Sequence, residues 1–129
     1  MKAALELYDS RVSEIAFSGS VAIVHFSHAY IHRSAGTPGQ DAGTGWSQEA
    51  QLVLSEARHL GTSPGMPNTI ADGYLEVGGI RHELIPLPFR RKGRAVLVLV
   101  FADGSQFEIQ GEQPFIELGG DAKLVEDLP

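Results

Sequence analysis

Three histidines that lie close together in the sequence are the first residues whose spacing could support chemistry. On a helix, His25, His28 and His32 would share one side and could hold a metal ion together. The surrounding residues alternate between apolar and polar types, however, which indicates a strand. In a strand His25 points away from the other two, and His28 and His32 stand about 13 Å apart. Bonds of about 2 Å cannot bridge that gap, so we expect no metal and no cofactor here.

The same strand geometry predicts a different kind of site, for a small molecule. His28, Tyr30 and His32 would form a row of rings on one strand face, at steps of about 7 Å. A glycine-rich segment, residues 34–45, follows this row and leads to Trp46. Rings beside a loop are typical of sites for a sugar, a peptide or another ring. These four residues are the candidate ligand site: His28, Tyr30, His32 and Trp46. The alternative is that Tyr30 and Trp46 are core or rim residues.

Other motifs give little support for catalysis. His82-Glu83 begins an HExxH pattern, but Pro86 occupies the fifth position and disfavours the helix that this zinc motif requires. The glycine-rich segment contains Asp41 and no lysine, so it does not resemble a phosphate-binding loop. No GxSxG elbow is present. We therefore expect a non-enzymatic protein, with an enzyme, metal-dependent or not, as an alternative.

A cluster of basic residues is the strongest charge feature. Arg90, Arg91, Lys92 and Arg94 are 4 of the 10 basic residues in the chain. They follow residues 85–89, whose two prolines favour an extended edge or connecting strand. Clustered arginines could dock an acidic partner or a phosphate group. The alternative is a solvated turn whose charge discourages pairing between sheet edges.

The strands that position these residues are predicted to form consecutive β-hairpins. Residues 11–17 and 21–26 flank a glycine-containing loop, and a three-residue loop would place Phe17 opposite Val21. Gly78-Gly79 suits a two-residue turn that places Val77 opposite Ile80, and the same register pairs Glu76 with Arg81.

A third hairpin surrounds Asp103-Gly104. A two-residue turn there would place Val100 opposite Phe107 and Val98 opposite Ile109 on a dry face. The other face of residues 95–101 would carry Leu97, Leu99 and Phe101. A strand that is apolar on both faces is central or covered, so we expect a second layer or another subunit on this face.

These patterns predict an all-β, mainly antiparallel fold, either a small sandwich or a barrel, in a single domain of residues 1–129. Residues 48–60 are ambiguous. A strand would place Ala50, Leu52 and Leu54 on one face, whereas a helix would place Ala50, Leu54, Ala57 and Leu60 on one face. We favour a strand there, and the fold has room for one short helix. Residues 115–118 read as a short strand that ends at Gly119-Gly120, after which residues 122–125 pair or fray.

Composition narrows the function classes. The 129 residues include no cysteine, which excludes disulfides, zinc thiolates and cysteine nucleophiles. A net charge of −6 opposes a nucleic-acid partner. No apolar stretch approaches the ~18 residues of a membrane span, and residues 1–7 do not resemble a signal peptide, so we expect a cytoplasmic protein. The leading hypothesis is a binding or protein-interaction module that forms a homo-oligomer or meets a protein partner. A domain that binds a small molecule, such as a carbohydrate, is the alternative.

Overall fold

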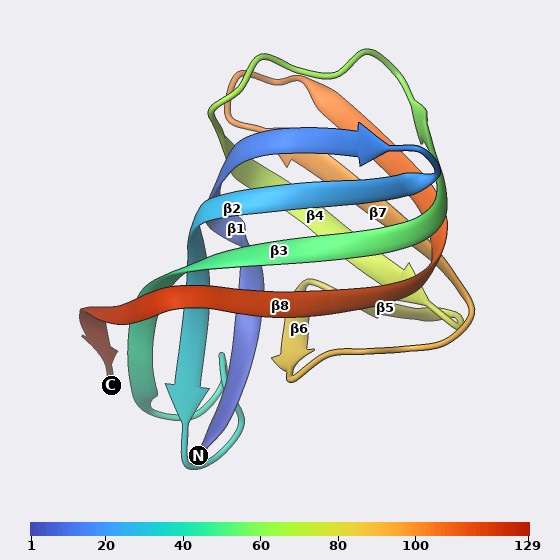
Figure 1. The fold of residues 1–129 in the computed structure, drawn as a ribbon. Coiled ribbons are helices and arrows are strands. Elements are labelled where there is room, and N and C mark those ends of the chain that lie inside the picture. Colours follow the sequence, from blue (N-terminus) through green and yellow to red (C-terminus); the bar gives the residue numbers. More distant parts are fainter.

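The computed structural model describes residues 1–129, and all of its regular elements are β-strands (Figure 1). The expectation of an all-β antiparallel fold is confirmed, and the fold contains no helix. None of its elements is therefore an apolar helix of membrane-spanning length. The strands are β1 (Lys2–Ser18), β2 (Val21–Ser34), β3 (Gly43–Leu60), β4 (Asn68–Val77), β5 (Ile80–His82), β6 (Leu84–Leu87), β7 (Arg94–Phe101) and β8 (Gln106–Leu128).

The strands form one sheet that closes on itself. Its order is β5-β4-β7-β8-β3-β2-β1-β6, and β4 also pairs with β1. Arg11 lies opposite Thr69 and Val12 lies opposite Asn68 in this closing contact. The ring β1-β2-β3-β8-β7-β4 is therefore a barrel, which leaves fewer strand edges exposed than an open sheet. The short strand β6 pairs with the first part of β1, and β5 pairs with the end of β4.

The long strands β1, β2, β3 and β8 bend together. Irregularities in pairing interrupt β2 at residues 26–29 and β3 at residues 47–49. On the flanking strands, Asp9 and Gly120 have positive φ angles of 69° and 62°. Such irregularities are β-bulges, in which one strand has more residues than its partner, and a bulge bends the strand and increases its twist. Figure 1 shows the result: β2, β3 and β8 cross the front of the barrel and then turn downward side by side into an extension.

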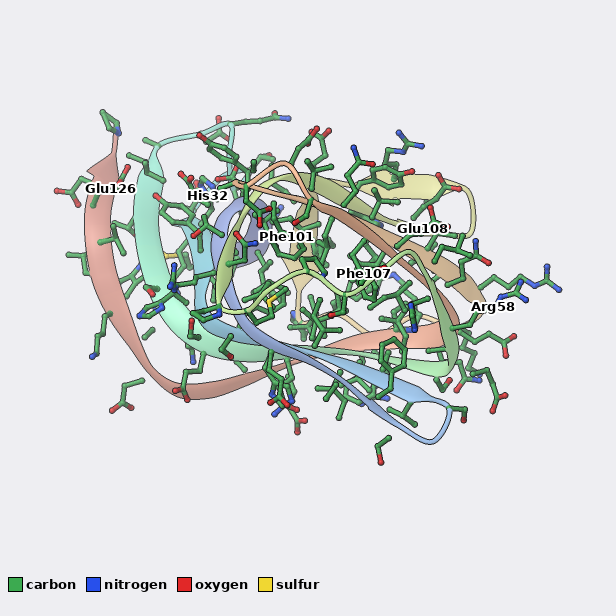
Figure 2. The ribbon with its side chains drawn as sticks, turned by 90° about the horizontal axis from the view of Figure 1, so that it is seen from above. His32, Arg58, Phe101, Phe107, Glu108 and Glu126 are labelled. Carbon is green, nitrogen blue, oxygen red and sulfur yellow. The ribbon has the colours of Figure 1, made fainter.

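A single buried apolar cluster fills the barrel and continues into the extension. Leu52, Leu97 and Phe107 belong to its barrel part, and Leu5 and Ile31 belong to its part in the extension. Figure 2 shows Phe101 and Phe107 pointing into the interior. In β3 and β7, for example, alternate residues belong to this cluster, as in strands with one buried face.

The first hairpin differs from its predicted register, and the second agrees. Ser18 lies opposite Val21, and Gly19 adopts a positive φ of 59° in a tight two-residue turn. The predicted three-residue loop, with Phe17 opposite Val21, is therefore wrong by one residue. At Gly78-Gly79 the prediction is confirmed: Val77 lies opposite Ile80, and a guanidinium nitrogen of Arg81 lies 3.5 Å from a Glu76 carboxylate oxygen.

The third hairpin also has a turn of a different length. The Phe101 N–H donates a hydrogen bond to the Ser105 carbonyl at 2.8 Å, so three residues form the loop. Gly104 supplies the positive φ, 88°, that such a loop requires. Leu99 now lies opposite Phe107 rather than Val100. This one-residue change exchanges the two faces of β7. Leu97, Leu99 and Phe101 form the core face. The interior of the barrel covers these side chains, where the sequence predicts a second layer or another subunit.

The ambiguous residues 48–60 form a strand, as favoured. They are part of β3, in which Ala50, Leu52 and Leu54 alternate into the core. Glu56 has a positive φ of 46° and a break in register surrounds it, so Ala57 also packs against the core. This bulge produces the helix-like spacing in the sequence. Residues 115–118 are not a separate short strand, because β8 continues through Gly120 to Leu128.

Candidate functional site

The aligned bends leave a hollow on the outer face of the sheet. A cavity of about 580 Å³ lies across β1, β2, β3 and β8 where they bend, and an adjoining cavity of about 330 Å³ shares Ser27 and Glu49 with it. We refer to the two together as the bend groove. The polar side chains that line the larger cavity are Ser13, His25, Ser27, Glu49, Gln51 and Glu117. The smaller cavity adds His28, Ser47, Gln48, Gly120, Asp121 and Lys123.

Strand pairing brings these distant residues into rows. His25 lies opposite Gln51, and Gln51 lies opposite Glu117, so the three side chains stand side by side on the outer face. In the next row Glu49 lies opposite Gly119, where an added Cβ would meet nothing within 4 Å. The missing side chain at Gly119 keeps the groove open toward β8.

The groove carries unbalanced negative charge. The ion pairs of the protein join Glu6 to His32 and Glu76 to Arg81, so neither Glu49 nor Glu117 has a cationic partner. Asp121 adds a third carboxylate, and Lys123 is the only lysine or arginine among the lining residues. No three histidine, aspartate or glutamate side chains of the protein are arranged to hold a metal ion. The groove therefore offers carboxylates to a cationic ligand from outside.

The structure does not bring the four predicted ring residues to one surface. Tyr30 and His32 do meet, with ring centroids 5.1 Å apart, and His28 lies farther along β2 in the bend groove. Trp46, however, lies directly opposite Ile31, so it is on the other face of the sheet and packs against the core. His28, Tyr30, His32 and Trp46 therefore do not form a single site. Tyr30 and His32 form a pair, His28 lies in the bend groove, and Trp46 packs against the core.

Tyr30 and His32 are held by neighbours within the extension. Nε2 of His32 lies 3.3 Å from a Glu6 carboxylate oxygen. The Tyr30 hydroxyl occupies the space left by the missing side chain of Gly45. Burial, followed by the nearby Glu126 carboxylate, raises the pKa of Tyr30 above its usual value. These side chains fill the space against one another, which indicates a structural role for the pair.

The basic residues do not act as one free cluster. The guanidinium carbon of Arg90 lies 4.3 Å from the Phe115 ring centroid, and that of Arg91 lies 4.6 Å from the Phe89 ring centroid. Arg94 begins β7 opposite Glu112, and Lys92 is exposed. Cation–π contacts of this kind hold guanidinium groups against the protein surface. Docking of an acidic partner by Arg90, Arg91, Lys92 and Arg94 remains a prediction.

His82, beside these arginines, makes stability depend on pH. Its ring lies 5.7 Å from the Phe89 ring, and burial, followed by the positive charge of Arg91, lowers its pKa below the ordinary 6.5. The unfolded chain therefore binds a proton at His82 more readily than the folded protein does. The contribution of His82 to the free energy of unfolding is complete above about pH 6.5 and is lost as the pH falls. We expect the melting temperature of H82Q to fall less than that of the wild type between about pH 7.5 and pH 5. The exposed H28Q is the control, and a wild-type pH dependence in H82Q would contradict this assignment.

Comparison with known proteins found no matching family model, no matching curated protein and no matching solved structure.

Proposed function

We propose that this protein is a non-enzymatic binding module that takes a positively charged segment of a partner protein into the bend groove. The observation that carries the proposal is the pair of carboxylates, Glu49 and Glu117, which line a hollow of about 580 Å³ without a cationic partner. Carboxylates bind arginine and lysine through charge-assisted hydrogen bonds, which are stronger than neutral ones.

The shape of the groove supports an elongated ligand rather than a single ion. Its two cavities adjoin at Ser27 and Glu49, and the second leads to Asp121. A peptide could place one cationic side chain near Glu117 and another near Asp121. The net charge of −6 of the whole chain adds a long-range attraction that would speed the encounter with a basic partner.

Peptide binding tests this proposal. The probe is a fluorescein-labelled ten-residue peptide in which arginine alternates with valine, compared with the same peptide carrying glutamate for arginine. We expect fluorescence anisotropy to show binding of the arginine peptide alone, with an affinity that falls as salt is raised. The double variant E49Q/E117Q should bind the arginine peptide at least about tenfold more weakly, because each substitution removes a charge-assisted contact.

The matched control is E83Q, which removes the same charge from an exposed residue outside the groove. Its affinity should stay within about twofold of the wild type, because only a long-range effect is lost. Equal binding of the arginine and glutamate peptides, no binding of either, or equal losses in E83Q and the groove variants would each refute the proposal.

A further inference from the structure

One long edge of β8 has no strand beside it. Through residues 106–112, β8 pairs with β7, and residues 89–93 then cover the next stretch. In that cover, the Gln113 N–H donates to the Gly93 carbonyl at 2.9 Å and the Ile116 N–H donates to the Phe89 carbonyl at 3.0 Å. From residue 117 to residue 128, β8 pairs with β3 on one side and with no strand on the other. We call residues 117–128 the free edge. Figure 2 shows this part of β8, with Glu126, as the outermost ribbon.

The free edge lacks several of the usual protections against pairing, although the bend at Gly120 interrupts it. Natural edge strands are commonly shielded by proline, by several lysines or by a covering segment. Residues 117–128 contain no proline and a single lysine, Lys123. Apolar side chains are exposed along it instead: Leu118 is 42% exposed, Leu124 57% and Val125 51%. Unpaired backbone groups beside exposed apolar side chains form a template for an added strand.

Charge selects the kind of strand that the free edge would accept. Its acidic residues outnumber its single lysine: they are Glu117, Asp121, Glu126 and Asp127. A second copy of this edge would bring like charges opposite one another, which is destabilising. A basic strand from another protein would instead place opposite charges across the pair, so charge complementarity disfavours a second copy as the occupant.

The free edge also forms one side of the bend groove. Glu117, Leu118 and Gly119 line its larger cavity, and Gly120 and Asp121 line its smaller one. A strand added here would therefore run along the groove with alternate side chains facing its carboxylates. The other side chains would face the side of the sheet that carries Leu124, which lies opposite Trp46.

We propose that the partner segment is an extended strand of another protein, with basic residues alternating with apolar ones, that adds to β8 at residues 117–128. This inference rests on the proposed function and specifies how its ligand is held. The backbone of the added strand would bond to β8, its basic side chains would meet Glu49 and Glu117, and its apolar side chains would cover Leu118 and Leu124.

N-methylated peptides test this mode of binding. In an added strand, the amides that face β8 belong to every second residue of the peptide. Two isomers of the arginine–valine peptide are compared with the unmethylated peptide, one methylated at the arginine amides and one at the valine amides. We expect one isomer to bind at least about tenfold more weakly and the other to stay within about threefold.

Hydrogen exchange of the protein provides a second readout. Binding of the unmethylated peptide should slow exchange at amides of the free edge on both sides of the bend at Gly120, because those amides become hydrogen-bonded. If the unmethylated peptide binds but the two isomers bind equally, strand addition is wrong while a charged ligand in the groove survives. If the protein alone sediments as a dimer with these amides already protected, the free edge belongs to a second copy.

Discussion

L99A is expected to lower the free energy of unfolding by about 3 kcal/mol, whereas V98A should cost less than about 1 kcal/mol. Leu99 is fully buried and lies opposite Phe107, so its truncation leaves a cavity that the barrel cannot fill. Val98 faces outward, where it is half-buried between Tyr74 and Glu108. Urea unfolding of both variants, with unchanged slopes of stability against denaturant, measures the difference.

The comparison between these neighbours tests the register of the β7–β8 hairpin. If Asp103-Gly104 formed a two-residue turn, Val98 would face Ile109 in the core and Leu99 would face outward. The order of the two losses would then be reversed. A larger loss in V98A than in L99A would therefore refute the three-residue loop at Ala102–Asp103–Gly104 and the core face that follows from it.

G73A is expected to cost about 2 kcal/mol or more. Gly73 lies in β4 opposite Leu99, and a Cβ at this position would stand 2.6 Å from the Val98 carbonyl oxygen. That atom belongs to the backbone of a paired strand, so it cannot move aside without disturbing the ladder between β4 and β7. The thermal midpoint of G73A should fall accordingly, by several degrees for a domain of this size.

G65A is the matched control for G73A. A Cβ at Gly65 would meet nothing within 4 Å, and its backbone is not in the left-handed region. Its stability should therefore stay within about 0.5 kcal/mol of the wild type. Similar melting temperatures for G73A and the wild type would show that β4 and β7 do not approach each other as closely as the structure has them.

Local patterns predicted the strands well but placed two turns one residue out. At Gly78-Gly79 the turn residues, the apolar alternation and the Glu76–Arg81 pair all favour the same register, and that register is confirmed. Around Asp103-Gly104, a two-residue loop and a three-residue loop can both place glycine where a positive φ angle is needed. Both also place apolar residues of the two strands opposite one another. Only packing inside the closed barrel distinguishes them, and the sequence does not display that packing.

The bend groove could not be recognised from the sequence for a similar reason. Glu49 and Glu117 are far apart along the chain, and each reads as an ordinary solvent-facing residue of its own strand. Pairing of β3 with β8 brings them to the same groove. The Gly119-Gly120 pair is a signal in the sequence for this groove: two glycines are typical of the end of a strand, but here they mark a bend within one. The sequence does not show which face of the sheet Trp46 lies on, because the irregular residues 34–45 separate it from the strand that carries Tyr30.

The shared bend in the four long strands also determines how costly ligand binding would be. The walls of the groove come from paired strands, with a break in the pairing at the bend, and not from a loop between strands. Ordering a loop on binding reduces affinity, since the lost conformational entropy offsets part of the contact energy. If the groove binds a peptide as proposed, its walls would need little ordering, so most of the entropic penalty would fall on the incoming segment. A partner that is already extended in its free state would therefore bind more tightly than a flexible one of the same composition.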